Sequence, residues 1–210
     1  MKSYLLSHFI TAITLLLLSF QSQADQWYHV ELIIFEQLDT ITDEQWPQMP
    51  DKPSSASLSP AMATKLIQSA KNKTLLNMAS RLKRTPSYQV HYHRSWQQPI
   101  IKKRKSKSVA IRSYNKLIEG DIRLYKGNYL HAALNVWLKE DATQAEPDRW
   151  SDYSPDGEEI VEEVRNPHLV QSRRIRPKKL YFFDHPKMGA TLKKIRTNER
   201  EAHSNQPLYK

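Results

Sequence analysis

The stretch LIEGDIRLYKGNYLHAALNVWL, residues 117–138, decides the fold class of this 210-residue chain. Apolar and polar side chains alternate on both sides of Lys126-Gly127-Asn128, whose composition is typical of a hairpin turn. One face before the turn would carry Ile118, Ile122 and Leu124, and one face after it Leu130, Ala132, Leu134, Val136 and Leu138. Two such strands pair antiparallel, with one face buried and the other facing water.

Further strands are predicted on both sides of this hairpin. Residues 27–35, WYHVELIIF, are apolar on both faces and rich in β-branched and aromatic residues, which is typical of a central strand. Residues 88–96 alternate, with Tyr88, Val90, Tyr92 and Trp96 on one face. Residues 169–183 have strand composition again, a turn is expected at 184–189, and Leu192 and Ile195 indicate a last short strand.

One helical segment is predicted over residues 61–84, where leucines recur at helical spacing before Pro86. Lys71-Asn72-Lys73 interrupts this pattern, so the segment gives one helix or two. The element order β, α, β, β, β, β predicts an α+β fold. We expect a mainly antiparallel sheet of about five strands with one or two helices packed on one face.

The first 24 residues have the three parts of a cleavable secretory signal peptide. Lys2 gives a positive start, residues 4–20 are almost wholly apolar, and Ser22-Gln23-Ala24 offers small residues for cleavage. A retained membrane anchor is the alternative, but the apolar run is shorter than the roughly 20 residues of a spanning helix. We therefore expect a periplasmic protein without stable membrane insertion.

The remaining chain is predicted to be a single α+β domain over residues 25–196. Long loops are expected at 37–60, which is rich in proline and serine, and at 140–168, which is strongly acidic. Residues 197–210 have the composition of a disordered basic tail. The chain has no cysteine, which excludes disulfides and the lipoprotein route of anchoring.

The formal net charge of +10 indicates an anionic partner. Export argues against nucleic acid and favours the fixed polyanions of the envelope, which are peptidoglycan with its stem-peptide carboxylates and lipopolysaccharide. The acidic and basic blocks of the sequence are equally typical of solvated surfaces that face one another.

Two basic patches are the candidate binding sites. The first is the run Lys102, Lys103, Arg104 and Lys105, expected to contact anionic glycan or lipid. The second is Arg173, Arg174 and Arg176, because arginine makes bidentate contacts to carboxylates that lysine cannot make. Trp46 and Trp150 lie in predicted loops and are candidates for stacking on a glycan or entering a partner's pocket.

Motifs for catalysis are weak. The chain lacks a G-x-S-x-G element and a cysteine nucleophile, and its four glycines do not form a phosphate-cradling loop. His91-x-His93 has a spacing that can chelate zinc, but a catalytic site needs a third ligand. The candidates in principle, none of which sits in a recognisable ligand motif, are His29, His131, His168 and His185. We expect no enzyme, metal or cofactor; a glycan hydrolase or metal-dependent amidase is the alternative.

Four blocks of the sequence resemble, in order, the CsiV family of periplasmic proteins from Gammaproteobacteria. The blocks are WYHVELIIFEQ at 27–37; Leu82, Tyr88-Gln89-Val90, His93 and Trp96-Gln97-Gln98-Pro99; Gly120-Asp121-Ile122, Tyr129-Leu130-His131 and 134–138; and Arg173-Arg174, 180–186 and Gly189. The resemblance implies a non-catalytic peptidoglycan-binding protein. It also implies a link to a class A penicillin-binding protein and its outer-membrane lipoprotein activator. A structural adaptor that binds only protein remains a further alternative.

Overall fold

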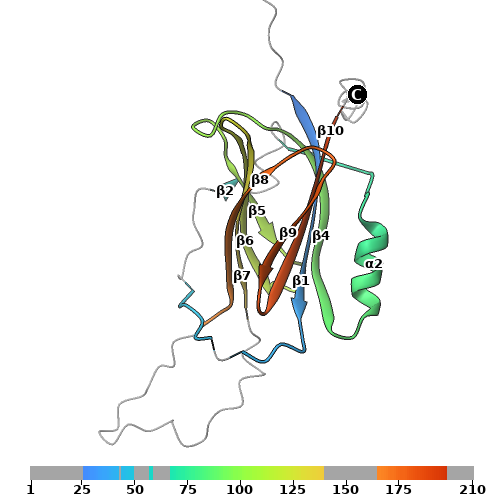
Figure 1. Ribbon diagram of the computed structural model, residues 1–210, viewed down its shortest axis with the longest axis vertical. Coiled ribbons are helices and arrows are strands. Elements are labelled where there is room, and N and C mark those ends of the chain that lie inside the picture. The colour runs from blue at the N-terminus through green and yellow to red at the C-terminus, as the bar shows by residue number, and fades with distance from the viewer. Residues whose placement is uncertain (1–25, 43, 50–56, 59–66, 140–164, 198–210) are drawn as a thin grey trace, which may run out of the picture.

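The computed structural model describes residues 26–42, 44–49, 57–58, 67–139 and 165–197. These residues form two sheets that face each other, and a helix that lies on the outer face of the first sheet (Figure 1). The predicted α+β class, mainly antiparallel with a helix on one face, is confirmed. The strands divide between two sheets because the chain crosses to the second sheet after residue 99 and returns to the first after residue 175. The two-residue strand at Ser57–Leu58 also lies in the second sheet, between two strands of the first in chain order.

The first sheet has the predicted central strand at its centre. In spatial order its strands are β3 (Gln68–Ser69), β4 (Tyr88–Pro99), β1 (Trp27–Gln37), β10 (Met188–Arg196) and β9 (Leu180–His185). β1 pairs antiparallel with β4 on one side and β10 on the other. Leu32 faces the core between the sheets, whereas Ile33 and Phe35 face the helix, so both faces of β1 are covered as expected.

The second sheet contains the predicted hairpin. Its strands, in spatial order, are β2 (Ser57–Leu58), β5 (Ser108–Arg112), β6 (Ile118–Lys126), β7 (Leu130–Leu138) and β8 (His168–Ile175). β6 and β7 pair from Ile118 with Leu138 to Lys126 with Leu130. β5 through β8 are antiparallel, and the two-residue β2 adds in parallel to β5. The sequence did not indicate β5, because five residues beside a basic run are too short for a clear alternation.

The core lies between the two sheets and is continuous across them. Val30, Leu32 and Ile34 of β1 are fully buried together with Ile122 of β6 and Leu134 of β7. Burial of side chains of this size contributes roughly 1.5–3 kcal/mol each. The edges of the sheets also join where the Gln171 side chain of β8 donates a hydrogen bond to the Asp184 carbonyl of β9 at 2.7 Å.

The predicted helix over 61–84 is wrong for its described residues before Leu76. Helix α2 spans Leu76–Arg84 only, and residues 68–69 form β3 instead. The Ser95 hydroxyl donates to the Ala70 carbonyl at 3.1 Å, which holds this part of the chain extended beside β4. The leucine spacing is real, but tertiary hydrogen bonds outweigh local helix propensity here.

The predicted strand over 169–183 is two strands of different sheets. β8 ends at Ile175 and β9 begins at Leu180. Pro177 has no N–H for a ladder, and Lys178 has a φ of +63°, so the chain turns at these residues. The expected turn at 184–189 is shorter, since His185 already pairs with Met188. The expected short last strand is the nine-residue β10.

A bulge divides the predicted alternation of residues 88–96. Tyr92 pairs with Ile34 but Val90 pairs with Phe35, so β4 has one extra residue at this point. Tyr92 therefore faces the core between the sheets, whereas Val90 packs with Phe35 on the helix side. The prediction of one common face for Tyr88, Val90, Tyr92 and Trp96 is wrong for this reason.

Several predictions fall outside the described residues. They are the signal peptide at 1–24, much of the loop at 37–60, nearly all of the loop at 140–168, and the tail beyond Thr197. Thr197 itself, expected as the first tail residue, is buried and donates its N–H to the Trp27 carbonyl at 3.1 Å. Within the described ranges, no helix is long and apolar enough to cross a membrane.

Replacement of Gly120 by alanine should strongly destabilise the fold. Gly120 has a φ of +156°, and an added Cβ would lie 2.1 Å from the Asn135 carbonyl oxygen of the neighbouring strand β7. We expect Gly120→Ala to lower the free energy of unfolding by about 2–4 kcal/mol, measured by urea denaturation. Gly127→Ala is the matched control, because its nearest neighbour is 3.9 Å away. Equal stability of both variants would contradict the register of the hairpin.

Candidate functional site

The first predicted basic patch lies in the turn between β4 and β5. Lys102, Lys103, Arg104 and Lys105 are all exposed. The Lys103 N–H donates to the Lys126 carbonyl at 3.1 Å, and the Lys126 N–H donates to the Ile101 carbonyl at 2.8 Å. The segment 101–107, which we call the basic loop, is therefore held against the end of β6.

Arg123 of β6 fixes the basic loop from the other side. Its Nε donates to the Ser106 hydroxyl at 2.9 Å, and its Nη2 donates to the Lys103 carbonyl at 2.5 Å. The Ser106 hydroxyl in turn donates to the Lys103 carbonyl at 2.9 Å. The five cations of the basic loop are thus carried on a hydrogen-bonded backbone.

A row of side chains crosses the outer face of the second sheet beside this loop. Tyr125, His131 and Arg174 are register neighbours on β6, β7 and β8. The rings of Tyr125 and His131 stack with centroids 5.1 Å apart, and Lys103 Nζ lies 5.2 Å from the Tyr125 centroid. We call the set the cationic platform: Lys103, Arg123, Tyr125, Tyr129, His131 and Arg174.

The second predicted basic patch is split by the geometry of β8. Arg174 points to the outer face, where its guanidinium lies 3.1 Å from the ring centroid of the half-exposed Tyr129. Arg173 is paired with the buried Ala132 and lies 5.8 Å from the Phe183 ring, toward the other face. Arg176 follows the end of β8, and its N–H donates to the Tyr181 hydroxyl. Of the three arginines, only Arg174 joins the cationic platform with Lys103.

The acidic groups of this outer face lie farther along the sheet and are largely compensated. Glu119 contacts Lys139 at 2.6 Å and Arg112 at 3.3 Å. Burial raises the pKa of Asp121, against the opposing effects of a hydrogen bond from Ser108 and the charge of Arg123. Cations therefore predominate at the end of the face that adjoins the basic loop.

The predicted stacking residues are not part of the platform. Trp46 is half-buried, and its ring lies 5.2 Å from that of His185, at the end of β9. His168, at the start of β8, lies close enough to His185 to be affected by its charge. Arg174 is six residues farther along β8, a distance of about 20 Å. Trp46 therefore marks the opposite end of the sandwich. Trp150 lies outside the described residues.

Two histidines near Trp46 form a second aromatic group, which the sequence did not indicate. The His168 ring stacks on Trp137 at 3.6 Å, and its Nε2 is 2.6 Å from Asn135 Oδ1. Burial, and after it the nearby His185, lowers the pKa of His168. Burial also lowers the pKa of His185, against the charges of Glu44 and Asp184. Both imidazoles are therefore neutral at neutral pH.

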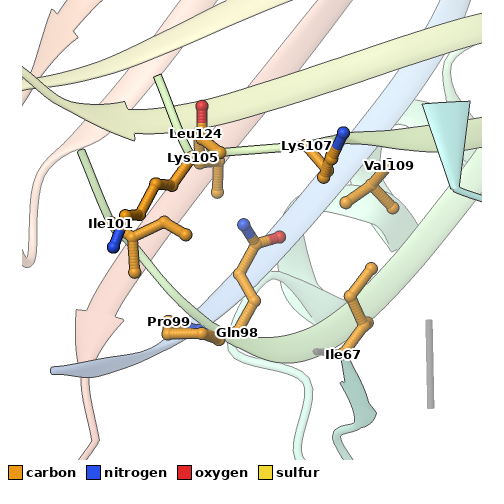
Figure 2. Close-up of a pocket in the computed structure, with 9 residues that line it drawn as sticks. Ile67, Gln98, Pro99, Ile101, Lys105, Lys107, Val109 and Leu124 are labelled. Atoms are coloured by element: carbon orange, nitrogen blue, oxygen red, sulfur yellow. The ribbon is translucent and has the colours of Figure 1, made fainter. Parts of the chain in front are cut away.

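A cavity of about 150 Å³ lies behind the basic loop (Figure 2). It opens between the end of β4 and the segment 101–109, with β6 behind it. The residues that line it are Ile67, Gln98, Pro99, Ile101, Lys105, Ser106, Lys107, Val109 and Leu124. The sequence indicated Lys105 as a binding residue but gave no sign of the cavity, because Ile67, Gln98 and Leu124 meet only in the folded chain.

The histidines of His91-x-His93 do not converge on a metal. His93 Nε2 lies 2.7 Å from Glu31 Oε1, and His91 Nε2 lies 2.8 Å from Glu36 Oε2. Each imidazole thus binds a different carboxylate of β1, and His91 is itself the extra residue of the bulge. Over the described part of the chain, no group of three or more histidine, aspartate or glutamate side chains is arranged to hold a metal ion.

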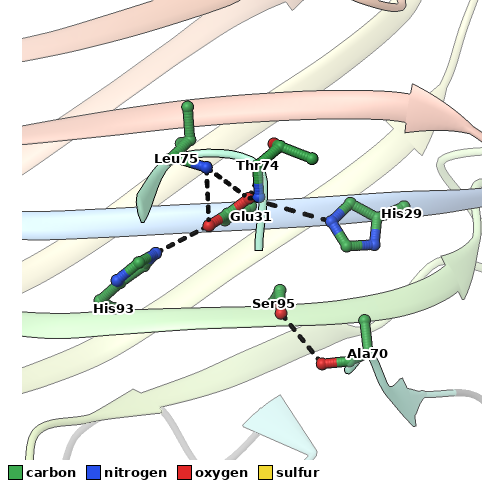
Figure 3. Close-up of polar contacts among 7 residues, drawn as sticks. All are labelled: His29, Glu31, Ala70, Thr74, Leu75, His93 and Ser95. Carbon is green, nitrogen blue, oxygen red and sulfur yellow. Dashed lines mark hydrogen bonds and ion pairs between the residues drawn. The ribbon is translucent and has the colours of Figure 1, made fainter. Parts of the chain in front are cut away.

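Glu31 is a fully buried carboxylate at the start of helix α2 (Figure 3). It accepts hydrogen bonds from the Thr74 N–H at 2.5 Å, the Thr74 hydroxyl at 2.8 Å and the Leu75 N–H at 3.1 Å. Burial raises the pKa of Glu31, but the hydrogen bonds from His93, Thr74 and Leu75 outweigh it and hold the pKa below 4.5. The carboxylate therefore acts as a structural cap and is already fully coordinated by the protein.

The fold is a β-sandwich that carries a row of exposed and half-buried cationic and aromatic side chains at one end of its second sheet. The chain belongs to the CsiV family, because the family model described as "Peptidoglycan-binding protein, CsiV" matches residues 7–197. The resemblance found in the sequence is thereby confirmed, and the protein is a peptidoglycan-binding protein of the cell envelope. Comparisons with curated proteins and with solved structures found no match.

Neutralisation of Glu31 should destabilise the protein and change its response to acid. The folded-state pKa of Glu31 is lowered, so its contribution is present above about pH 4.5 and is lost as the pH falls through the folded-state pKa. We expect Glu31→Gln to lower the free energy of unfolding at pH 7 by about 2 kcal/mol and to flatten its decline below pH 4.5.

Glu36→Gln is the matched control for this experiment. Glu36 also pairs with a histidine, but its side chain is 22% exposed. We expect a loss less than half as large, measured by urea denaturation at pH 3, 4, 5 and 7. If the free energy of unfolding of Glu31→Gln fell below pH 4.5 as steeply as that of the unaltered protein, the role assigned to this carboxylate would be contradicted.

Proposed function

We propose that this protein is a non-catalytic periplasmic protein that binds peptidoglycan through the cationic platform and the basic loop. The observation that carries the proposal is that Lys103 and Arg174 lie at the same end of the outer face of the second sheet. They come from two basic segments far apart in the sequence, yet they flank one stacked row of Tyr125 and His131. Peptidoglycan offers the matching groups, since its stem peptides carry carboxylates.

The residue types on the platform suit carboxylates. Arg174 has a planar guanidinium that can bind one carboxylate through two parallel hydrogen bonds. Lys103 supplies a point charge with a flexible reach. A single exposed ion pair contributes only about 0–1 kcal/mol, so affinity must come from several contacts to a repeating polymer. The wall is such a polymer.

We further propose that the protein helps to activate a class A penicillin-binding protein together with its outer-membrane lipoprotein activator. The support is the family resemblance, joined to the separation of the two ends of the sandwich. The platform lies at one end and the half-buried Trp46 at the other, which leaves a second surface for a protein partner while the wall is bound. Activation requires tighter binding to the active synthase than to the idle one.

Charge reversal on the platform should weaken binding to the wall. The test is co-sedimentation of the chain, without its predicted signal segment, with purified peptidoglycan sacculi at increasing salt. We expect Lys103→Glu with Arg174→Glu to raise the dissociation constant about tenfold, equivalent to ~1.4 kcal/mol. Lys83→Glu with Arg84→Glu on helix α2 makes the same change of charge away from the platform.

The helix variant should retain near-normal binding. Equal losses in both double variants would show that wall binding follows net charge and not the platform. Binding of the unaltered chain that disappears at physiological salt, where the screening length is about 8 Å, would count against a fitted site in the same way.

Removal of the Trp46 ring should separate the two proposed activities. We expect Trp46→Ala to reduce stimulation of glycan-strand synthesis by the penicillin-binding protein with its lipoprotein activator, while sedimentation with sacculi stays unchanged. The measurement is the initial rate of lipid-linked precursor consumption. Full stimulation by the variant would show that Trp46 is not part of the partner surface.

The alternative function, an envelope hydrolase, has its own test. Release of muropeptides from sacculi by the protein alone, with or without zinc, would identify such an enzyme.

A further inference from the structure

The cavity behind the basic loop has an apolar floor of limited size. Val109 and Leu124 are nearly fully buried, and Ile67 and Pro99 complete the apolar wall (Figure 2). Its volume of about 150 Å³ matches cavities that admit a molecule as small as benzene. A sugar ring in this space would leave buried hydroxyls without partners. The floor therefore fits a small aliphatic group.

A hydrogen-bond donor stands in the middle of the cavity. The Gln98 side chain rises among the lining residues, as Figure 2 shows. The Trp96 indole donates to Gln98 Oε1 at 2.6 Å. Because an indole nitrogen only donates, this bond fixes the orientation of the amide and leaves Nε2 as its donor end.

The rim of the cavity carries positive charge. Lys105 and Lys107 both line it, and both are exposed. An ammonium on a partly exposed rim favours an anion held over a less polar floor, where the local dielectric is lower than in water. The cavity thus combines an apolar floor, an amide donor and two cations within one small site.

We propose that this cavity binds the C-terminal D-alanine of a peptidoglycan stem peptide. The methyl group would contact Val109 and Leu124, and the free carboxylate would face Lys105, Lys107 and the Gln98 amide. Among the groups of the wall, this end has a methyl group and a carboxylate on the same carbon. The other stem carboxylates, those of the γ-linked D-glutamate and of diaminopimelate, have no methyl group on the carbon that bears the carboxylate. This inference rests on the proposed function and names the chemical group that one part of the site recognises.

The inference gives the two parts of the surface different roles. The cationic platform would hold the wall through several exposed carboxylates, whereas the cavity would select stems that end in free D-alanine. When a stem peptide acts as donor in cross-linking, its D-Ala–D-Ala amide bond breaks, the terminal D-alanine leaves with its carboxylate, and the preceding D-alanine carbonyl forms a new amide with the acceptor's amine. The protein would therefore favour stems that have not yet acted as donors.

The experiment is an NMR titration of the ¹⁵N-labelled chain with the synthetic peptide L-Ala-γ-D-Glu-meso-diaminopimelate-D-Ala-D-Ala. A second titration uses the same peptide with a C-terminal carboxamide. We expect the acid to bind about tenfold more tightly than the carboxamide, which is the contribution of one charge-assisted hydrogen bond. The largest shifts should fall within residues 98–109.

Two matched double variants show which cations cause the preference for the acid peptide over the carboxamide peptide. Lys105→Gln with Lys107→Gln, both exposed residues, should bind acid and carboxamide peptides equally. Lys103→Gln with Arg174→Gln, on the platform, should keep the preference and weaken sedimentation with sacculi.

The outcomes also separate this inference from the proposed function. Equal affinity for acid and carboxamide in the unaltered chain, or shifts confined to the platform, would overturn the cavity assignment while normal sedimentation leaves wall binding intact. A preference that survives in Lys105→Gln with Lys107→Gln would overturn it too. Failure of the unaltered chain to bind sacculi at all would overturn the proposed function itself.

Discussion

The buried carboxylate of Glu31 is the interaction on which the arrangement of this protein depends. It stands on the central strand of the first sheet and binds both the beginning of helix α2 and His93 of β4. Loss of such a carboxylate leaves several buried donors without an acceptor, which costs about 1–3 kcal/mol for each. Glu31 thus ties the beginning of α2 to the first sheet, whose outer face the helix covers. Lys194 contrasts with Glu31, because the contact of its buried ammonium is an aromatic ring: Nζ lies 4.7 Å from the Tyr28 ring centroid. Burial lowers the pKa of Lys194 to about 8.

The basic surface lies on the outer face of the second sheet, whereas helix α2 covers the outer face of the first. β6, β7 and β8 contribute their inward residues to the core, and the alternate residues form the outer face. At one end of that face, Arg123 and the backbone of Lys126 hold the basic loop in place. The backbone that carries the cations of this loop is thus held in place beside β6, which pairs with β7, and β7 pairs in turn with β8. A polymer with repeated carboxylates can use such a surface, because less backbone freedom is lost on binding.

The sequence predicts those elements whose pattern is local. Alternation around Lys126-Gly127-Asn128 was sufficient for the hairpin, and the doubly apolar run at 27–35 was sufficient for a central strand. Features that depend on distant partners could not be predicted. Helix α2 begins where Glu31, more than forty residues earlier, can cap it. The bulge in β4 changes the face of Val90, and the joining of Lys103 with Arg174 depends on the register of three strands.

Hydrogen–deuterium exchange of the chain, with and without soluble peptidoglycan fragments, tests the central claim most directly, because it reports on every backbone amide in one experiment. If the platform and the basic loop bind the wall, bound fragments will slow exchange in residues 101–107, 123–131 and 172–176 and leave helix α2 unchanged. Slowed exchange in α2 or around Trp46, with no change in those three segments, would contradict the account.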